Sequence, residues 1–300
     1  MGSILITGVD GFTGRHVARA LVQAGHEVHG LTHAPALVDG LASITACDIR
    51  DEAALRRVIA ATAPSRVLHL AAVAFAAYTS ADAFYKINII GSRALLEACL
   101  TSGGDRIRQV ILASSASVYG RAEGKVDEHR AAAPANDYAV SKLAMEYMAR
   151  LYVGRLPVTI TRPFNYTGVG QSTDFLIAKI VDHVRRRAPV IQLGNLGVVR
   201  DFSDVRSVAD VYLRLLDRSP YCSDLEIFNI CSGVGHSLQQ VLSLACETAG
   251  HTMEVQVNPA LVRATDVSTL IGDRDRLDHA IGPLKRPPLA ETIRWMVEAA

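Results

Sequence analysis

Short runs of aliphatic and β-branched residues alternate with segments of helical periodicity along the first half of the chain. The apolar runs include "SILIT", "RVLHLAA", "QVILAS" and "VTIT", and they lack the polar alternation of a half-exposed strand. Continuous apolar strands between helices are typical of a parallel sheet that is covered on both faces. The pattern therefore predicts an α/β fold with a doubly wound parallel sheet and helices over residues 11–24, 51–62, 82–100 and 137–153.

Composition narrows the class of protein. The 300 residues are 49% hydrophobic and 20% charged, with a formal net charge of +1, which is typical of a soluble globular protein and does not favour nucleic acid as a partner. The opening "MGSILITGVDG" has no basic segment, long apolar segment or cleavage site, so we expect a cytoplasmic protein without a membrane anchor. We expect neither disulfides nor a metal site, because no CxxC pair occurs among Cys47, Cys99, Cys222, Cys231 and Cys246.

A glycine-rich turn joins the first predicted strand to the first predicted helix. In "ITGVDGFTG", Gly8 permits the tight turn, Gly11 lets the backbone approach a pyrophosphate, and Gly14 allows close packing of the helix. The amides at the helix start, at Phe12 and Thr13, would then face the diphosphate. This context predicts a dinucleotide-binding turn.

The chain accordingly divides into two predicted regions. We expect a Rossmann domain that binds NAD(P) over residues 1–165, to which part of 197–235 returns. After Pro163 the pattern is less regular, and residues 166–300 are expected to form a smaller mixed α/β region that binds the substrate. Ligands of open α/β sheets bind beyond the carboxyl ends of the strands, which is where this region is expected.

The GxxGxxG spacing resembles that of the extended short-chain dehydrogenase/reductase family, and other stretches resemble it in the same order. "ACDIRD" is similar to the family's adenine contact, "HLAA" to the strand end beside the nicotinamide ribose, and "INIIGS" to the segment with a structural asparagine. The resemblance spans the first half of the chain. It implies further cofactor contacts by Asp48, Ile49, Leu70, Ala71, Ala72, Asn88 and Pro163.

The end of the second predicted strand bears on the choice of cofactor. An acidic residue there would bind an adenosine 2′-hydroxyl and repel a 2′-phosphate, but this chain has Leu31, Thr32 and His33. Thr32, His33 or Arg15 could receive a phosphate instead. We therefore predict NADP(H), with NAD as the alternative.

The stretch "YAVSK" places Tyr138 and Lys142 on one face of a predicted helix. A tyrosine with a pKa of about 10 needs a neighbouring cation to exchange protons at neutral pH, and Lys142 would supply it. The resemblance implies that Ser115, with Ser117 as a neighbour, orients the reacting oxygen and that Lys142 also holds the nicotinamide ribose. A chance pairing of tyrosine and lysine is the alternative.

The chain lacks two acidic residues that a dehydration would need. Nucleotide-sugar 4,6-dehydratases resemble this chain but place acidic residues after the serine, where this chain has Ala116 and Ser117. A methyl group accepts no proton and an unassisted serine is a weak acid or base, so dehydration is disfavoured.

Four stretches of the second half resemble the branch of the family that acts on GDP-linked 6-deoxyhexoses, and GDP-4-keto-6-deoxymannose reductases in particular: "RPFNYTGVGQ", "LGNLGVVRDFSDVRSVADV", "FNICSG" and "RATDVSTLIGD". Arginines could make bidentate contacts to a diphosphate, although Arg200 could instead pair with a neighbouring aspartate. The candidate substrate residues are Ser117, Asn165, Gln171, Arg200 and Arg263.

We therefore predict NAD(P)H-dependent reduction of the C4 ketone of a GDP-4-keto-6-deoxyhexose, giving a GDP-rhamnose-like or GDP-talose-like product. Alternatives are a nucleotide-sugar 4-epimerase with tightly bound NAD and a non-catalytic cofactor sensor. The resemblance also implies a homodimer that forms through helices 82–100 and 137–153.

Overall fold

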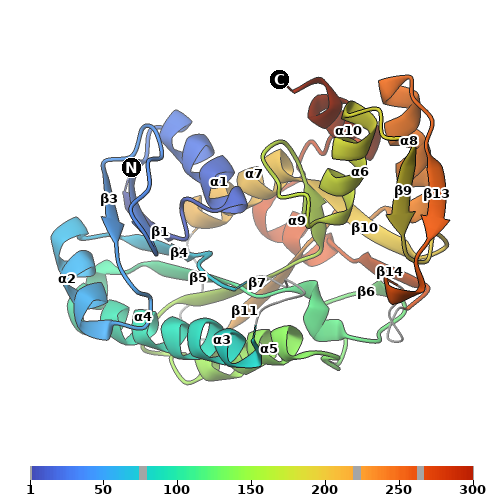
Figure 1. The fold of residues 1–300 in the computed structure, drawn as a ribbon. Coiled ribbons are helices and arrows are strands. Elements are labelled where there is room, and N and C mark those ends of the chain that lie inside the picture. The colour runs from blue at the N-terminus through green and yellow to red at the C-terminus, as the bar shows by residue number, and fades with distance from the viewer. Residues whose placement is uncertain (1, 74–79, 219–223, 262–266, 300) are drawn as a thin grey trace. The chain divides into compact units, whose positions relative to one another are not determined.

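The computed structural model describes residues 2–73, 80–218, 224–261 and 267–299, and these group into two compact units. The first unit comprises Met1–Gly120, Pro134–Pro163 and Ala209–Phe228. The second comprises Arg121–Ala133, Phe164–Val208 and Asn229–Ala300. Figure 1 gives the element labels.

In the described part of the chain, the first unit is built on a seven-stranded sheet with the order β11-β7-β5-β4-β1-β2-β3. The pairs from β3 through to β7 are parallel, which confirms the predicted doubly wound sheet. Strand β1 pairs with β2 on one side and β4 on the other, so the chain order reverses there, as it does where such sheets bind dinucleotides. The strands are β1 (Ser3–Thr7), β2 (Glu27–Thr32), β3 (Ser43–Ala46), β4 (Arg66–His69), β5 (Gln109–Ala113), β7 (Val158–Pro163) and β11 (Glu226–Ile230).

Helices cover both faces of this sheet, as its uniformly apolar strands require. In Figure 1, α1 and α7 lie on one face, and α2, α4 and α5 lie on the other. Leu55, Leu95 and Met145 from the latter three helices are fully buried in the main core with residues of the sheet. The helices are α1 (Phe12–Gln23), α2 (Glu52–Thr62), α3 (Ala81–Tyr85), α4 (Ser92–Ala98), α5 (Asp137–Arg150) and α7 (Val205–Asp217), of which α7 starts in the second unit.

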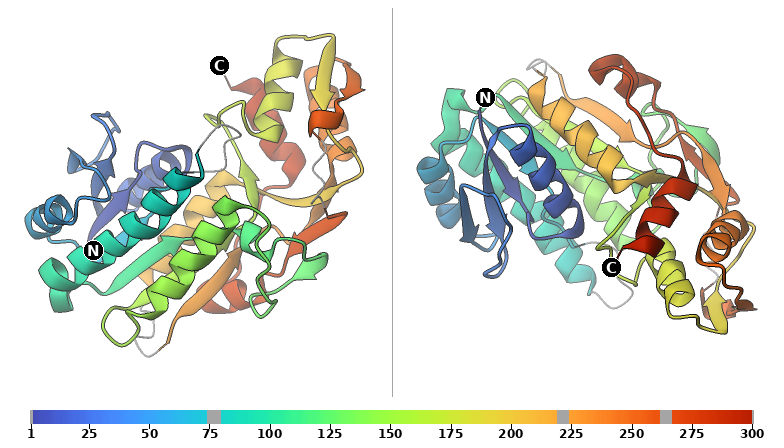
Figure 2. Two further views of the ribbon diagram at one scale, coloured as in Figure 1. Left: turned by 60° about the horizontal axis from the view of Figure 1, so that its bottom comes forward. Right: turned by 90° about the horizontal axis from the view of Figure 1, so that it is seen from above.

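The predicted helix over 82–100 is one helical segment with changes of hydrogen-bond pattern. The π-helical turns η1 (Lys86–Gly91) and η2 (Cys99–Gly103) flank α4, and the 3₁₀ turn η3 (Gly104–Arg106) follows η2. A second 3₁₀ turn of the first unit, η4 (Ala116–Tyr119), comes after β5. Figure 2 shows the helical segment 81–103 and α5 side by side on one face of the sheet. Asn88 lies in η1, and irregular turns of this kind are frequent at functional sites.

The second unit contains smaller sheets packed with helices. One sheet has the order β12-β10-β14-β6 with β8 on β10, and β13 pairs with β9. Ile180, Val241 and Ile293 from α6, α8 and α10 form its apolar core with β-sheet residues. The elements are β6 (Gly124–Val126), β8 (Asn165–Thr167), β9 (Val190–Leu193), β10 (Val199–Asp204), β12 (Gly235–Ser237), β13 (Glu254–Val257), β14 (Thr269–Gly272), α6 (Leu176–Arg185), α8 (Leu238–Ala249), α9 (Asp275–Ile281), α10 (Leu289–Glu298) and η5 (Pro259–Leu261).

Candidate active site

The glycine turn after β1 has the close backbone contacts that a dinucleotide-binding turn requires. Gly8 has φ of +69°, and a Cβ there would lie 2.9 Å from the backbone of Ala71. A Cβ at Gly14 would lie 2.3 Å from the carbonyl oxygen of Gly8. Helix α1 starts at Phe12 directly after the turn, with Gly11 as its N-cap, so the first-turn amides of Phe12 and Thr13 lie beside it. The turn therefore fits a bound diphosphate, as the glycine spacing predicts.

A buried polar chain fixes the strand end next to this turn. Thr7 Oγ1 lies 2.6 Å from Nδ1 of His69, and Nε2 of His69 lies 2.8 Å from Oγ of Ser92. The Ala71 amide donates to Thr7 Oγ1 at 3.1 Å. Burial, followed by the charge of Lys142, lowers the pKa of His69 to about 3, so this histidine is neutral at physiological pH.

Asn88 connects that strand end with α5. Its Oδ1 accepts a hydrogen bond from the Val73 amide at 3.0 Å, and its Nδ2 donates to Ser141 Oγ at 3.0 Å. Ser92 Oγ in turn donates to the Asn88 carbonyl at 2.7 Å. The structure thus places Asn88 beside Val73, the residue that follows Ala72. The sequence pattern does not single out Thr7, His69, Ser92 and Ser141, whose only signal is polarity within or beside apolar runs.

Helix α5 carries the tyrosine and the lysine of "YAVSK". Asn136 caps the helix by accepting the Ala139 amide at 2.9 Å, so Tyr138 lies in the first turn and Lys142 one turn later. The ring of Tyr138 meets Phe84 edge-on, with centroids 5.8 Å apart. The two residues of the pair share one helix face because they are four positions apart.

Lys142 is buried, and its Nζ donates to the carbonyl of Ala113 at 2.7 Å. Burial lowers the pKa of Lys142 to about 8, and the nearby carboxylate of Glu146 opposes that shift. Ala113 ends β5, two residues before Ser115. The structure therefore brings the lysine to the strand end that carries the candidate serine.

Ser115 begins the short turn η4. Its Oγ accepts the Ser117 amide at 3.1 Å and lies 3.0 Å from Ser117 Oγ. The two serines therefore form one hydroxyl pair, and Ala116 between them is buried. Pro163 lies at the end of β7, which is the neighbour of β5.

Two candidate phosphate ligands, Arg15 and His33, lie in or reach the loop that follows β2. Arg15 on α1 donates from Nε to the Asp10 carbonyl at 2.9 Å and from Nη1 to the Leu37 carbonyl at 3.4 Å. His33, directly after β2, is exposed and contributes to lowering the pKa of Asp48. The largest cause of that shift, to about 2, is the hydrogen bonding of Arg50 to Asp48.

Thr32 and Ile49 have well-defined partners in this region. Thr32 Oγ1 donates to the Ala34 carbonyl at 2.7 Å. Ile49 is buried, and its side chain occupies the space where Gly91 would carry a Cβ. Thr32 is therefore engaged with the loop after β2, and Ile49 packs on the helical segment that contains Asn88.

In the second unit, the candidate substrate residues make local contacts. Asn165 Nδ2 donates to the Asp201 carbonyl at 3.1 Å. Gln171 accepts from Thr167 Oγ1 at 2.6 Å and donates to the Tyr166 carbonyl at 2.9 Å. These contacts keep Asn165 and Gln171 next to β8 and β10.

Of the two candidate arginines in this part of the chain, the structure describes Arg200. Arg200 Nη1 donates to the carbonyls of Val199 and Val267, both at 2.9 Å. These bonds tie the Arg200 side chain to its own strand and to the segment before β14. Arg263 lies outside the described residues.

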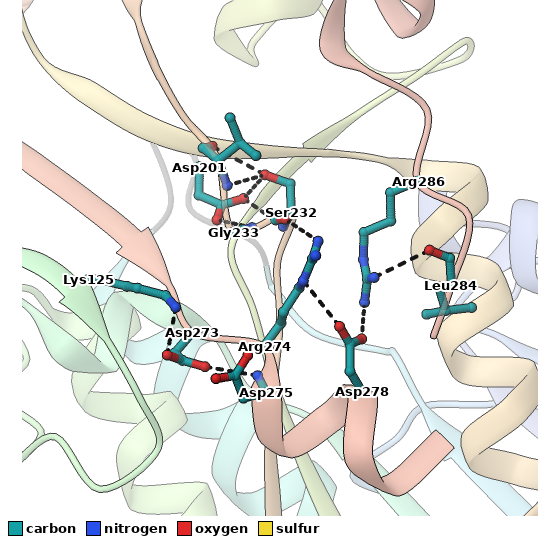
Figure 3. Close-up of polar contacts among 11 residues, drawn as sticks. Lys125, Asp201, Ser232, Gly233, Asp273, Arg274, Asp275, Asp278, Leu284 and Arg286 are labelled. Atoms are coloured by element: carbon teal, nitrogen blue, oxygen red, sulfur yellow. Dashed lines mark hydrogen bonds and ion pairs between the residues drawn. The ribbon is translucent and has the colours of Figure 1, made fainter. Parts of the chain in front are cut away.

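The buried carboxylate of Asp201 organises the loop next to Arg200. It accepts the amides of Ser232 and Gly233 at 2.8 and 2.9 Å, and Ser232 Oγ at 2.7 Å (Figure 3). It also accepts the amide of Gly272 at 3.2 Å. Burial raises the pKa of Asp201, while these hydrogen bonds lower it. These hydrogen bonds hold the 232–233 loop and the end of β14 against β10.

Charged pairs continue this network toward α9 (Figure 3). Arg274 donates to the Ser232 carbonyl at 2.8 Å and pairs with Asp278 at 3.1 Å. Arg286 also pairs with Asp278, at 2.5 Å. Together these contacts secure the 232–233 loop.

Within the described ranges, no group of histidine, cysteine, aspartate and glutamate side chains could hold a metal ion. Among the same residues, no helix combines the length and the apolar character needed to cross a membrane.

Comparisons with the sequences of known proteins show which family the chain is similar to. Residues 4–231 match the family model described as "NAD dependent epimerase/dehydratase family". GDP-6-deoxy-D-talose 4-dehydrogenase of Aggregatibacter actinomycetemcomitans is 33% identical over 93% of this chain and 91% of its own length. GDP-6-deoxy-D-mannose reductase of Pseudomonas aeruginosa is 30% identical, with 93% and 90% covered.

Solved structures show the same fold. A crystal structure of a Burkholderia cenocepacia J2315 protein, whose assignment as an epimerase is provisional, is 45% identical with a TM-score of 0.92, covering 99% of this chain and 97% of that one. The structure of RMD from Pseudomonas aeruginosa complexed with NADPH is 26% identical, with a TM-score of 0.84 and coverage of 99% and 98%. UDP-glucose 4-epimerase of Thermus thermophilus, in complex with NAD, is 27% identical, with a TM-score of 0.87 and the same coverage. The chain therefore belongs to the NAD dependent epimerase/dehydratase family, the extended branch of the short-chain dehydrogenases/reductases, and is an NAD(P)-dependent oxidoreductase.

Proposed function

We propose that the chain reduces the C4 ketone of a GDP-4-keto-6-deoxyhexose to a GDP-6-deoxyhexose, using NAD(P)H. The observation that carries this proposal is the buried ammonium of Lys142, which is held at the end of β5 two residues before Ser115 and one helical turn after Tyr138. Such an arrangement suits proton transfer to a carbonyl oxygen. The similarity to a GDP-6-deoxy-D-talose 4-dehydrogenase and to a GDP-6-deoxy-D-mannose reductase supports the substrate class.

In this mechanism the bound nicotinamide supplies hydride, and the chain's own residues manage the charge on the oxygen. Tyr138 donates its phenolic proton to the C4 oxygen as negative charge develops there. Ser115 donates a hydrogen bond to the same oxygen, and the ammonium of Lys142 stabilises the phenolate that remains. Water exclusion around the buried Lys142 strengthens this electrostatic effect.

Dehydration has no support at this site. Ala116, which follows the candidate serine, offers no acid or base, and Ser117 is hydrogen-bonded to Ser115. We therefore propose a ketone reduction without loss of water.

The proposed substrate contacts are Ser117, Asn165, Gln171, Arg200 and Arg263. The guanidinium groups suit the diphosphate, because arginine presents planar donors that match phosphate oxygens. For cofactor we propose NADP(H). The guanidinium of Arg15, which reaches the loop after β2, supports it, as does the NADPH complex of the related RMD structure.

Two further features of the proposal concern the whole protein. We propose a cytoplasmic homodimer that forms through the helical segment 81–103 and α5. Exposed apolar side chains on that face support it, namely Ile90, Val140, Tyr147 and Leu151.

The test is an assay of NADPH consumption with freshly prepared GDP-4-keto-6-deoxymannose, followed by NMR of the product to define the stereochemistry at C4. We expect stoichiometric oxidation of NADPH and a GDP-6-deoxyhexose product. Turnover of a UDP-linked or dTDP-linked sugar with none of the GDP sugar would overturn the assignment of the base.

A nucleotide-sugar 4-epimerase is the second candidate, supported by the similarity to the UDP-glucose 4-epimerase structure with NAD. The same tyrosine and lysine would serve it. It predicts NAD that copurifies with the protein and interconversion of sugars without net cofactor consumption.

A further inference from the structure

Glu146 is a buried carboxylate on α5, the helix that also carries Tyr138 and Lys142. It lies on α5 four residues after Lys142, so the two side chains share one helix face. Its side chain is only 3% exposed. A carboxylate at this depth is stable only when its oxygens are well hydrogen-bonded and its charge is balanced.

Three donors satisfy that carboxylate. Ser114 Oγ donates to Oε1 at 2.5 Å, and Arg162 donates from Nε to Oε1 at 3.0 Å and from Nη2 to Oε2 at 2.6 Å. Arg162, on β7, is itself buried and donates from Nη1 to the hydroxyl of Tyr119 at 3.1 Å. The bidentate arginine balances the charge of this buried carboxylate.

Lys142 and Glu146 are attached to adjacent residues at the end of β5. The ammonium of Lys142 binds the carbonyl of Ala113, and the carboxylate of Glu146 binds the hydroxyl of Ser114. The cation and the anion are therefore held at one strand end, immediately before Ser115.

Building on the proposed reduction, we propose that Glu146 is a positioning residue that keeps the buried Lys142 protonated beside Tyr138, and that Arg162 holds the Glu146 carboxylate in place for this task. Burial disfavours the ammonium form of Lys142, and the Coulombic attraction of Glu146 opposes this effect of burial. Without the carboxylate, Lys142 would lose its proton nearer neutral pH and could no longer stabilise the tyrosine phenolate.

Other ionisable groups around Lys142 do not substitute for Glu146. From β4, His69 is neutral because burial lowers its pKa to about 3. From β7, Arg162 is a cation and cannot attract an ammonium. The helical segment 81–103 contributes the neutral Asn88 to α5, through Ser141, and Asp82 on that segment pairs with Lys86.

The test measures the Lys142 titration directly, without substrate. The chain contains five lysines, so protein labelled with ¹³C at the lysine ε-carbon gives five NMR signals, and the Lys142→Arg variant identifies the one of interest. We expect the Lys142 signal to titrate with a midpoint near the pKa of about 8. In the isosteric, neutral Glu146→Gln variant the midpoint should fall by about one pH unit or more.

Glu146→Asp is the conservative variant that separates charge from packing. It keeps the carboxylate but shortens the side chain, so we expect its midpoint to stay within about 0.5 pH units of the wild-type value. Should Glu146→Gln fail to fold because Arg162 is left unpaired, the double variant Glu146→Gln/Arg162→Gln removes both charges, and we expect its midpoint to fall as well. Equal midpoints in folded Gln variants and in the wild type would overturn the proposal.

Glu226→Gln is the matched control, because it removes the carboxylate of another poorly exposed ion pair in the first unit, with Arg218. It should leave the Lys142 midpoint unchanged. In the reductase assay, Glu146→Gln should lower kcat about tenfold at pH values above both midpoints and leave KM for the nucleotide sugar unchanged. If the NMR shift occurs without reductase turnover in the wild type, the proposed reaction is wrong while the role of Glu146 stands.

Discussion

The burial of Lys142 has a cost in stability that the proposed function explains. A base whose pKa is lowered on folding, here from 10.5 to about 8, binds fewer protons in the folded state than in the unfolded state between those pH values. The folded state is therefore destabilised at neutral pH, and stability rises as the pH increases through that window. At about 1.4 kcal/mol per pKa unit the cost is about 3 kcal/mol.

Replacing this lysine should consequently stabilise an inactive protein. We expect Lys142→Met to raise the free energy of unfolding at pH 7 by about 2 kcal/mol, since loss of the hydrogen bond to Ala113 offsets part of the gain. The gain should disappear near pH 10.5, where the lysine is neutral in the folded state and only half protonated in the unfolded state. Urea denaturation at both pH values measures this, and a variant less stable than the wild type at pH 7 would contradict it.

Residue placement could be predicted where it depends on local spacing. The positions of Tyr138 and Lys142 on one helix follow from "YAVSK" alone. The pairing of Glu146 with Arg162 does not, because these residues come from a helix and a strand and meet only once the sheet order is fixed. His69 was missed for the same reason, since its partners lie on β1 and α4.

At the scale of elements, the loop after β2 is the part of the proposed cofactor site that should decide the preference for NADP over NAD. The guanidinium of Arg15 reaches from α1 to the Leu37 carbonyl in that loop, so a cation stands beside the strand end where no acidic residue occurs. A 2′-phosphate in this position would gain a charge-assisted contact that a 2′-hydroxyl cannot provide.

We therefore expect Arg15→Ala to weaken NADPH binding about tenfold and to leave NADH binding within a factor of about two. Arg19→Ala is the matched control, because Arg19 is also exposed and lies one turn later on α1. Fluorescence titration of each variant with both cofactors gives the affinities. Equal losses for NADPH and NADH would contradict a role for Arg15 in discriminating between them.

Elements themselves were predictable to different degrees. The strands of the main sheet and α1, α2 and α5 follow from apolar runs and helical periodicity, and the structure confirms them. The π-helical turns η1 and η2 do not follow, because they differ from an α-helix in their hydrogen-bond pattern, which the apolar positions of so short a segment do not specify. The inclusion of Arg121–Ala133 in the second unit also had no signal, since it depends on the long-range pairing of β6 with β14.

At the scale of the whole molecule, the outer face of α5 and of the segment beside it carries more apolar surface than a solvent-exposed helix needs. Tyr147 is 64% exposed and Leu151 is 73% exposed, and Ile90 on η1 is 53% exposed. Tyr147 and Leu151 are four positions apart, so they project in nearly the same direction. Such a face favours association with a second copy of the chain.

We expect the wild-type protein to sediment as a dimer and the Tyr147→Glu/Leu151→Glu variant to sediment as a monomer, because burying two carboxylates without partners is unfavourable. Val257→Glu, on β13, is the control, since it also replaces an exposed apolar side chain and should leave the dimer intact. A monomeric wild type, or a double variant that remains dimeric, would contradict this interface.

The proton donated by Tyr138 is the central claim, and the most direct measurement compares kcat for the reduction of GDP-4-keto-6-deoxymannose by the wild type and by Tyr138→Phe. The substitution removes only the hydroxyl and keeps the ring that packs against Phe84. We expect kcat to fall by about 100-fold or more, with the affinity for NADPH within about twofold of the wild-type value. A Tyr138→Phe enzyme that reduces the ketone at close to the wild-type rate would contradict the account.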